Sequence, residues 1–144
     1  MFLGEFTHNL DSKGRLTLPA KYREQLKQGL VVTRNPEAKC LLLYPMTEWA
    51  VVAKRISDLP LANRQSALLR RVMFSAAEDL MLDKQGRILL SQRLRKFAQI
   101  DGSVVLAGMN TFIELWNPDV WDEQVLQQLE QDGLGEALFE ALGI

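Results

Sequence analysis

The chain has 144 residues, of which 47% are hydrophobic and 24% are charged, and its formal net charge is −1. A chain of this size and composition can bury one core, or two small cores that share a surface, and is typical of a globular protein. Its longest apolar run is a few residues where a membrane span needs about 20, and its N-terminus lacks the regions of a signal peptide, so we expect a cytoplasmic protein that does not span a membrane.

The first predicted unit begins with an alternating strand that runs into the sequence Asp-Ser-Lys-Gly-Arg at residues 11–15. Aspartate can bond its own backbone and glycine tolerates a positive φ, so this sequence predicts a tight turn. Pro19 is predicted at the first position of a short helix, and Gly29 lies just past the end of that helix. The other strands of the unit are predicted over residues 15–18, 30–33 and 40–44.

Two helices are predicted to follow this unit and to join it to the next. Thr47 can cap a helix that continues to about Ile56. A second helix is predicted within residues 61–75, because apolar side chains recur there at helical spacing opposite a basic face. The apolar residues are Ala67, Leu68, Val72 and Met73, and the basic residues are Arg64, Arg70 and Arg71.

The turn sequence returns 72 residues later, which indicates an internal repeat. Residues 82–90 are identical to residues 10–18 at five of nine positions. The same offset pairs Leu43 with Leu115, Tyr44 with Trp116 and Trp49 with Trp121. The valine pairs at 31–32 and 104–105 align only if the offset slips by about one residue. We therefore predict two diverged β-β-α-β-β units, the second with strands over residues 87–90, 103–107 and 112–116 and with Ser91 as the N-cap of its helix.

An acidic helix is predicted to follow the second unit. Asn117, Pro118 and Asp119 supply an N-cap, a first-position proline and an acidic first turn, and the helix is expected to continue to about Gln131. Glycines at positions 133 and 135 are expected to break it before a short last helix. Because residues 134–142 are apolar on one side, we expect this helix to pack on the same chain or on a neighbour.

Charge is distributed unevenly along the chain. Residues 1–75 hold 12 basic and 6 acidic side chains, residues 76–117 hold 5 of each, and residues 118–144 hold 7 acidic side chains and no basic one. A basic front with an acidic tail suits a protein that binds a polyanion with one part and stays soluble through another. The alternative is that these charges only cover solvated faces.

The inventory of catalytic and metal-binding side chains is small. His8 is the only histidine and Cys40 the only cysteine, so a nucleophile–histidine pair or a four-ligand zinc site would depend on these two residues. A carboxylate pair of Asp11 and Asp83 could serve acid–base chemistry, but each is better explained as the organiser of its own turn. We therefore predict no enzyme activity, no catalytic residue, no metal, no cofactor and no small-molecule substrate. Cys40 is predicted to be a small buried thiol.

An arginine ends both turns, at positions 15 and 87, although a turn has no general need for one. Its guanidinium group is a fixed fork of donors that suits phosphate oxygens or the O6 and N7 acceptors of guanine. The alternative is a salt bridge from each arginine to the aspartate of its own turn, and both interpretations can hold together. Further basic side chains near the turns are Lys13, Lys84, Lys21 and Arg23, with Arg93, Arg95 and Lys96 on the second helix.

These motifs carry a resemblance to a known family. Residues 11–16 with Leu18-Pro19, residues 41–45 with Glu48-Trp49, and residues 83–88 and 112–116 resemble the MraZ family of bacterial transcription regulators, over nearly the whole chain to about residue 122. The resemblance implies an α+β, β-rich fold of the SpoVT/AbrB swapped-hairpin type, a double β-barrel in which two β-β-α-β-β repeats interlock about a pseudo-two-fold axis. It also implies a ring-like homo-oligomer that binds double-stranded DNA at repeated promoter boxes of the division and cell wall gene cluster.

We therefore predict a sequence-specific DNA-binding regulator, a repressor and autoregulator located at the nucleoid. Its predicted parts are repeat 1 (1–49), a helical linker (50–75), repeat 2 (76–121) and an acidic helical tail (122–144). The family's DNA-contacting arginine carries over to Arg15, and less directly to Arg87, because Ser91 stands where many members have proline. The predicted DNA-binding residues are Arg15, Lys13, Arg87, Lys84, Lys21 and Arg23, and the turn-organising ones are Asp11, Gly14, Asp83 and Gly86. The alternative is a protein-interaction module of the same fold, such as an antidote that covers a toxin.

Overall fold

The computed structural model describes residues 1–144, and each repeat folds in the predicted order β-β-α-β-β. The first repeat contains β1 (Glu5–Asn9), β2 (Arg15–Thr17), α1 (Ala20–Leu26), β3 (Leu30–Arg34) and β4 (Leu41–Pro45). The second contains β5 (Glu78–Leu80), β6 (Arg87–Leu89), α4 (Gln92–Ala98), β7 (Ser103–Gly108) and β8 (Ile113–Trp116). Helices α2 (Met46–Ser57) and α3 (Arg64–Phe74) join the repeats, and α5 (Pro118–Trp121) and α6 (Leu134–Glu140) follow them. No helix has both the length and the apolar character needed to cross a membrane.

The two repeats are interlocked through their strands. Strand β1 pairs with β7 of the other repeat, and β5 pairs with β3, so each repeat completes the sheet of its partner. The result is an antiparallel sheet in the order β1-β7-β8-β4-β3-β5 and a separate two-stranded ribbon of β2 and β6. The predicted α+β class and the interlocked repeats are confirmed. The ladder pairs leave the six-stranded sheet open, without the closure of a barrel, because β1 and β5 end it as edge strands.

The strand register fixes a pseudo-two-fold axis and corrects the sequence alignment. Leu42 lies opposite Glu114, its own counterpart at an offset of 72, and Leu16 lies opposite its counterpart Ile88. Val31 pairs with Tyr44, and Val105 pairs with Trp116. Because Tyr44 and Trp116 are equivalent, Val31 is equivalent to Val105, at an offset of 74. The slip is therefore two residues and not about one, since the loop after α4 is longer than the loop after α1 and the β7–β8 turn is shorter.

The central strands are buried on both faces, which explains the continuous apolar run at residues 41–45. Leu41 and Leu43 point into the main core, together with Leu16 and Ile88 from the ribbon. The alternate side chains Leu42 and Tyr44 point to the other face and pack under α2 and α3, while Cys40, Val105 and Trp116 pack under α5. Period-two alternation along a strand sends neighbouring side chains to opposite faces, so both faces need a cover.

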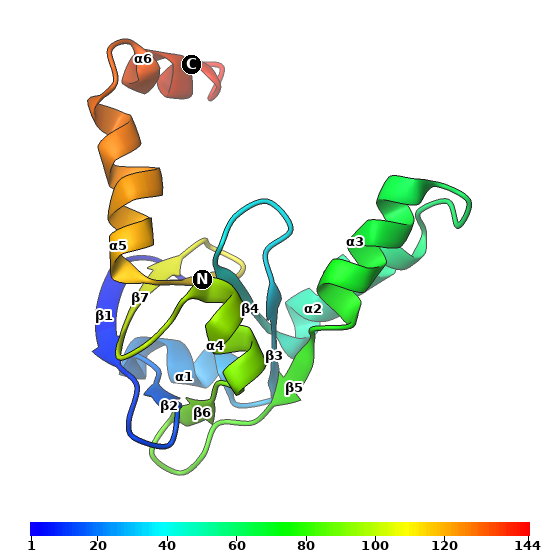
Figure 1. Ribbon diagram of the computed structural model, residues 1–144, viewed down its shortest axis with the longest axis vertical. Helices are drawn as coiled ribbons and strands as arrows, with labels where there is room; N and C mark the ends of the chain where they lie inside the picture. The colour runs from blue at the N-terminus through cyan, green and yellow to red at the C-terminus, as the bar shows by residue number, and fades with distance from the viewer.

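Two arms diverge from the body at the end away from the ribbon (Figure 1). The basic arm, residues 46–74, consists of α2 and α3, and the acidic arm, residues 118–144, runs from α5 to α6. The arms are equivalent by the repeat, because α2 follows β4 as α5 follows β8. Each begins with a tryptophan packed on the last strand, with ring centroids 5.9 Å apart for Tyr44–Trp49 and 5.7 Å apart for Trp116–Trp121.

Helix boundaries agree with the sequence at some caps and differ at others. The side chains of Ser91 and Asn117 cap α4 and α5 as predicted, accepting from Leu94 N at 3.3 Å and Asp119 N at 2.8 Å. Pro19 is the N-cap of α1 and not its first residue, and Thr47 is not a cap. Helix α2 starts directly from β4, because Met46 N donates to Gly29 O at 3.1 Å and leaves no turn for a side-chain cap.

The acidic arm is helical over the predicted span, but its winding changes along the way. After α5 come a π-helical turn (Asp122–Leu126) and a 3₁₀ turn (Gln127–Glu130). Gly133, with φ of 78°, ends this stretch as predicted, because glycine adopts the left-handed conformation without strain. Gly135 does not break the chain and lies inside α6.

Burial predicts an inert Cys40 thiol. Burial, with the nearby charge of Glu114 adding to it, raises the pKa of Cys40 to about 12, so almost no thiolate forms near neutral pH. We expect the native chain at pH 8 to react with a thiol reagent such as DTNB at least about 100-fold more slowly than the chain in urea. Fast labelling of the folded chain would contradict the core packing described above.

Candidate nucleic-acid interface

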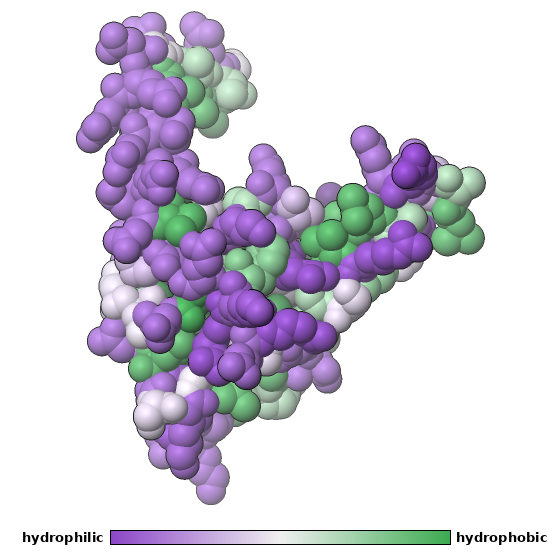
Figure 2. All heavy atoms as spheres, in the orientation of Figure 1, coloured by the Kyte–Doolittle hydropathy of each residue, from purple (hydrophilic) through white to green (hydrophobic).

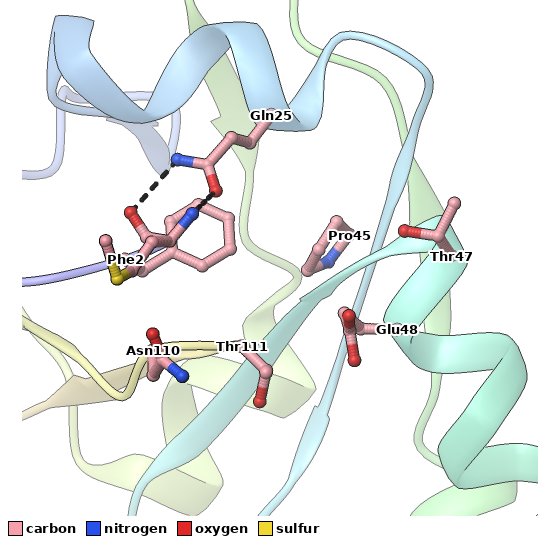
Figure 3. A pocket seen from close by; sticks show the side chains of 8 residues that line it. Phe2, Gln25, Pro45, Thr47, Glu48, Asn110 and Thr111 are labelled. Carbon is pink, nitrogen blue, oxygen red and sulfur yellow. Dashed lines mark hydrogen bonds between the residues drawn. The ribbon is translucent and has the colours of Figure 1, made fainter.

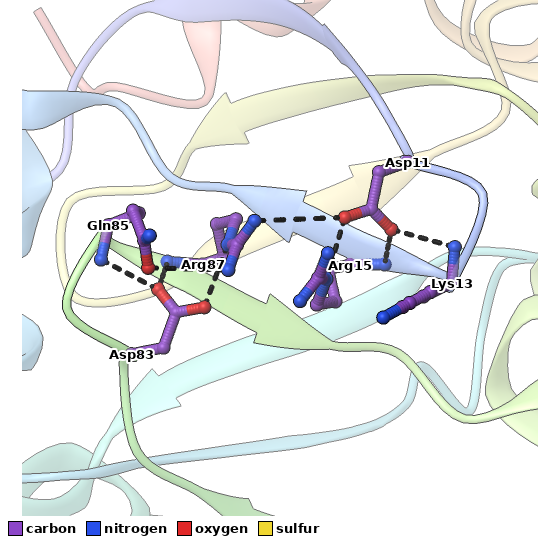
Figure 4. A network of polar contacts seen from close by, with 6 residues as sticks. All are labelled: Asp11, Lys13, Arg15, Asp83, Gln85 and Arg87. Carbon is purple, nitrogen blue, oxygen red and sulfur yellow. Dashed lines mark hydrogen bonds and ion pairs between the residues drawn. The ribbon is translucent and has the colours of Figure 1, made fainter.

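Both predicted turns lie at the end of the molecule opposite the two arms (Figure 1). Asp11 organises the first turn (Figure 4). One oxygen of its carboxylate, Oδ1, accepts from the backbone N–H groups of Lys13 and Arg15, each at 2.9 Å. The other, Oδ2, accepts from Nε of Arg15 at 2.6 Å. Gly14 has φ of 81°, a conformation that side-chain-bearing residues avoid. The aspartate therefore folds the turn and orients the arginine at the same time.

The second turn repeats this geometry around Asp83. Its carboxylate accepts from the backbone N–H groups of Gln85 and Arg87, each at 2.9 Å, and from Nε of Arg87 at 2.7 Å. Gly86 has φ of 75°. The salt bridge to the turn aspartate is thus present in both repeats, and it leaves the outer nitrogens of each guanidinium group for other contacts.

The ribbon of β2 and β6 carries these arginines on its outer face. Leu16 and Ile88 are buried in the core, so the alternate residues on either side of them point outward. Arg15 lies opposite Leu89, and Thr17 lies opposite Arg87. Leu18 N donates to Gly86 O and Leu90 N donates to Gly14 O, which ties each strand to the other turn. The outer face is a short antiparallel platform with an arginine near each end.

The two arginines differ in the contacts that their outer nitrogens make within the chain. Arg87 also donates Nη2 to Gln85 Oε1 at 3.3 Å, and its Nη1 lies 4.0 Å from the Asp11 carboxylate. Neither Nη nitrogen of Arg15 has a hydrogen-bond partner within the chain, and the residue equivalent to Gln85 in the first turn is Lys13. The first turn therefore presents an oriented guanidinium group with free donors and a lysine, whereas the second holds its arginine within the ribbon.

Arginines from the helices cross to the opposite turn. Arg23 of α1 donates Nε to Leu18 O at 3.0 Å and lies so close to Gly86 that a Cβ there would be 2.3 Å from its Nε. Arg95 of α4 makes the equivalent bond to Leu90 O at 3.0 Å and lies over Gly14. A helix arginine of each repeat thus packs over the turn of the other repeat. A side chain at Gly14 or Gly86 would therefore be crowded by this arginine, in addition to being strained by the positive φ.

Sequence reasoning underrated two features of this surface. It named Arg95 only as part of a basic helix, although Arg95 stands 72 residues after Arg23 and the repeat offset could have identified it. It also did not single out Thr17 and Leu89, which lie beside the arginines on the outer face, and Leu89 is 54% exposed there. Strand alternation alone would have placed both residues on the arginine face.

The predicted lysines occupy different settings. Lys13 and Lys84 are exposed on the turns and have no ion-pair partner within the chain. Lys21 lies on α1, with its Nζ 5.4 Å from the ring centroid of Phe6 and 5.6 Å from that of Tyr22. The structure therefore brings Lys13, Arg15, Lys84 and Arg87 together on the two turns and the ribbon with Arg23 beside them, whereas Lys21 lies against aromatic rings.

A pocket of about 360 Å³ lies away from the ribbon, where the N-terminus is fastened (Figure 3). The side chain of Gln25 accepts from the terminal amine of Met1 and donates to Met1 O at 3.2 Å. The other lining residues are Phe2, Pro45, Thr47, Glu48, Asn110 and Thr111. Glu48 is the only ionisable side chain here, and no group of three or more metal-ligating side chains occurs anywhere in the structure.

Comparison with known proteins gives a consistent family match. The family model described as "MraZ protein, putative antitoxin-like" matches residues 1–72 and again residues 73–141. Among similar curated proteins, the "Transcriptional regulator MraZ" of Herpetosiphon aurantiacus is 50% identical over 121 residues, which is 84% of each chain. Proteins of the same name from Roseiflexus sp. and Clostridium tetani are 42% and 38% identical, over 90% and 100% of each chain.

The turn geometry predicts a loss of stability in acid. Hydrogen bonds from the Arg15 backbone and side chain and from the Lys13 backbone lower the pKa of Asp11 to about 2, and equivalent bonds lower the pKa of Asp83. The stabilisation is therefore complete above about pH 4, the unfolded-state value, and is lost as the pH falls through the folded-state pKa. Urea-unfolding midpoints should drop more steeply between about pH 4 and 2 in the parent than in Asp11→Asn. Equal slopes in the parent and in Asp11→Asn/Asp83→Asn would contradict this account.

Proposed function

This chain belongs to the MraZ family, and on that premise we propose that it is a transcriptional regulator that binds double-stranded DNA through the outer face of its β2–β6 ribbon. Its relatives are named as transcriptional regulators and not as enzymes, which supports this class of function. The major groove of DNA admits a two-stranded antiparallel ribbon, and several regulators read bases with one.

The proposal rests on the hydrogen bonding of Arg15. Its Nε is held by Asp11 at 2.6 Å, so the direction of the guanidinium plane is set before any ligand arrives, while both Nη groups have no partner in the chain. A fork of this kind donates two hydrogen bonds to O6 and N7 of guanine, the commonest specific contact in the major groove. Arg15 is the base reader in this proposal, and Arg87 is its more restrained counterpart.

Lysines and helix arginines contribute affinity in this proposal. Lys13 and Lys84 contact phosphates on either side of the ribbon, Arg23 supports the second turn, and Lys21 reaches phosphates farther out. Such contacts position the protein but carry no sequence information. Thr17 and Leu89 present methyl groups that can contact thymine, which also offers a methyl group in the major groove.

Repeated binding sites fit the small size of this ribbon. One ribbon has a single arginine whose outer nitrogens are both unpaired, so one contact gives modest affinity. If several copies assemble in a ring, several ribbons can engage repeated boxes at once, and avidity raises affinity by about 10²–10⁴ without new contacts. We propose such boxes in the promoter of the division and cell wall gene cluster, bound by a ring-like homo-oligomer that represses its own gene.

Substitution of Arg15 tests the base contact. We expect Arg15→Ala to lose about 1–3 kcal/mol of specific binding per site, a 5- to 160-fold change, without unfolding. Arg15→Lys should keep non-specific affinity but lose discrimination, because lysine has the charge without the fork. Mobility-shift titrations with DNA selected from a random pool measure both, and Arg55→Ala, an exposed arginine of α2, is the matched control. An unchanged specific affinity of folded Arg15→Ala would rule out the proposed reader.

Salt dependence tests whether phosphates are neutralised. We expect log K to fall linearly with log [salt], and each phosphate contact to contribute a slope of about −0.9. Lys13→Ala and Lys84→Ala should each reduce the slope by about one unit while leaving base preference unchanged. Fluorescence anisotropy between about 50 and 200 mM salt measures this slope. A flat profile would contradict DNA as the ligand.

A further inference from the structure

The acidic arm exposes apolar side chains that the rest of the chain does not cover. Only its base is packed, where Val120, Trp121 and Val125 lie against the sheet. Beyond that point Leu129 is 56%, Leu138 is 54% and Phe139 is 60% exposed, and Figure 2 shows apolar atoms gathered beside α6. The acidic arm carries seven acidic side chains and no basic one. Exposed apolar groups rimmed by one sign of charge are typical of an interaction surface.

The face of α6 that pairs charge with an apolar group is well defined. Glu136 and Glu140 are one turn apart on the helix, with Phe139 beside them, and all three are exposed. These residues and Gly135 line a shallow surface hollow at the end of the arm. A partner for this face needs a basic helix with an exposed apolar residue between its charges.

The basic arm carries such a face. On α3, Arg64, Leu68 and Arg71 stand at i, i+4 and i+7, so they share one side of the helix, and all three are exposed. Leu68 is 59% exposed, and the same residues line a groove of about 480 Å³ with Leu61 and Ala67. Residues 46–74 hold five basic and two acidic side chains, so this arm is positive where the other is negative.

The acidic face of α6 and the basic face of α3 cannot contact each other within one chain. They are equivalent by the pseudo-two-fold axis and diverge from opposite halves of the sheet, so α6 and α3 stand apart at their outer ends (Figure 1). The ribbon is no alternative partner in the same chain, because it lies at the other end of the body. The complementary surfaces can therefore meet only between two molecules.

We propose that the Glu136–Phe139–Glu140 face of α6 docks on the Arg64–Leu68–Arg71 face of α3 in a second copy of this chain. Phe139 would pack on Leu68 in the groove, and the carboxylates would face the guanidinium groups, which fixes the register of the two helices. The contact is head-to-tail, because each copy offers one donor arm and one acceptor arm. Repeated head-to-tail contacts close into rings or extend into filaments. The inference deepens the self-assembly in the proposed function by naming its surfaces, and it does not depend on DNA.

Charge reversal on either arm tests the contact in the full-length chain without DNA. Light scattering after size-exclusion chromatography should give an oligomer for the parent, and a mass near the 16.4 kDa of one chain for Glu136→Lys/Glu140→Lys and for Arg64→Glu/Arg71→Glu. The two variants mixed in equal amounts should reassemble, because the reversed tail of one matches the reversed arm of the other. Glu123→Lys/Glu130→Lys, with the same charge change on the acidic arm outside α6, is the matched control and should stay assembled.

Four results would overturn the proposal: a monomeric parent, an oligomer that survives either reversal, a mixture that stays monomeric, or a control that dissociates equally. Circular dichroism establishes that each variant is folded. If a reversal variant does not fold, Leu68→Ser and Phe139→Ser probe the same contact without a change of charge, and each should reduce the mass to one chain. Arg15→Ala should keep the parent oligomer, so a failure of DNA binding is distinguishable from a failure of assembly.

Discussion

Strand β1 pairs with β7 and strand β5 pairs with β3, and the other features of this fold depend on that exchange. Neither repeat has a complete sheet by itself, so neither can bury its apolar strands alone. Interlocking brings Leu16 and Ile88 together on the axis and forms the ribbon whose ends carry the two turns. The candidate interface is therefore a product of the pairing of repeats, and it would not exist in an isolated copy.

The turns are built so that one carboxylate performs two tasks. Asp11 satisfies the backbone N–H groups of its turn and also fixes the Nε of Arg15, which removes much of the rotational freedom that an exposed arginine would lose on binding. A preoriented fork costs less to immobilise, and this favours specific over diffuse contact with a polyanion. The salt bridge and the proposed binding role are therefore complementary and not competing explanations of the arginine.

The two repeats have diverged, so equivalent positions carry side chains of different charge and hydrogen-bonding capacity. Where the second turn has Gln85 to hold Arg87, the first has Lys13 and leaves the outer nitrogens of Arg15 unpaired. Where the first repeat is followed by a basic arm, the second is followed by an acidic one. A symmetric pair of repeats would present two equal faces, whereas these differences give the molecule one turn with an unpaired arginine fork and two arms of opposite charge.

The sequence by itself determined the repeat, the β-β-α-β-β order, the two turns and the caps at Ser91 and Asn117, because these depend on local backbone chemistry and on short-range periodicity. It misplaced Thr47, since α2 starts directly from β4 and its first N–H group is satisfied by Gly29 O in the tertiary fold. It also placed Pro19 inside α1, whereas Pro19 is the N-cap and the helix begins one residue later. The exchange of strands, the offset of 74 at Val31 and Val105, and the packing of Arg23 and Arg95 over the opposite turns were decided only by tertiary structure. Each of these joins residues that are distant in the chain, and local sequence preference carries no information about which distant partner a strand edge or a side chain will meet.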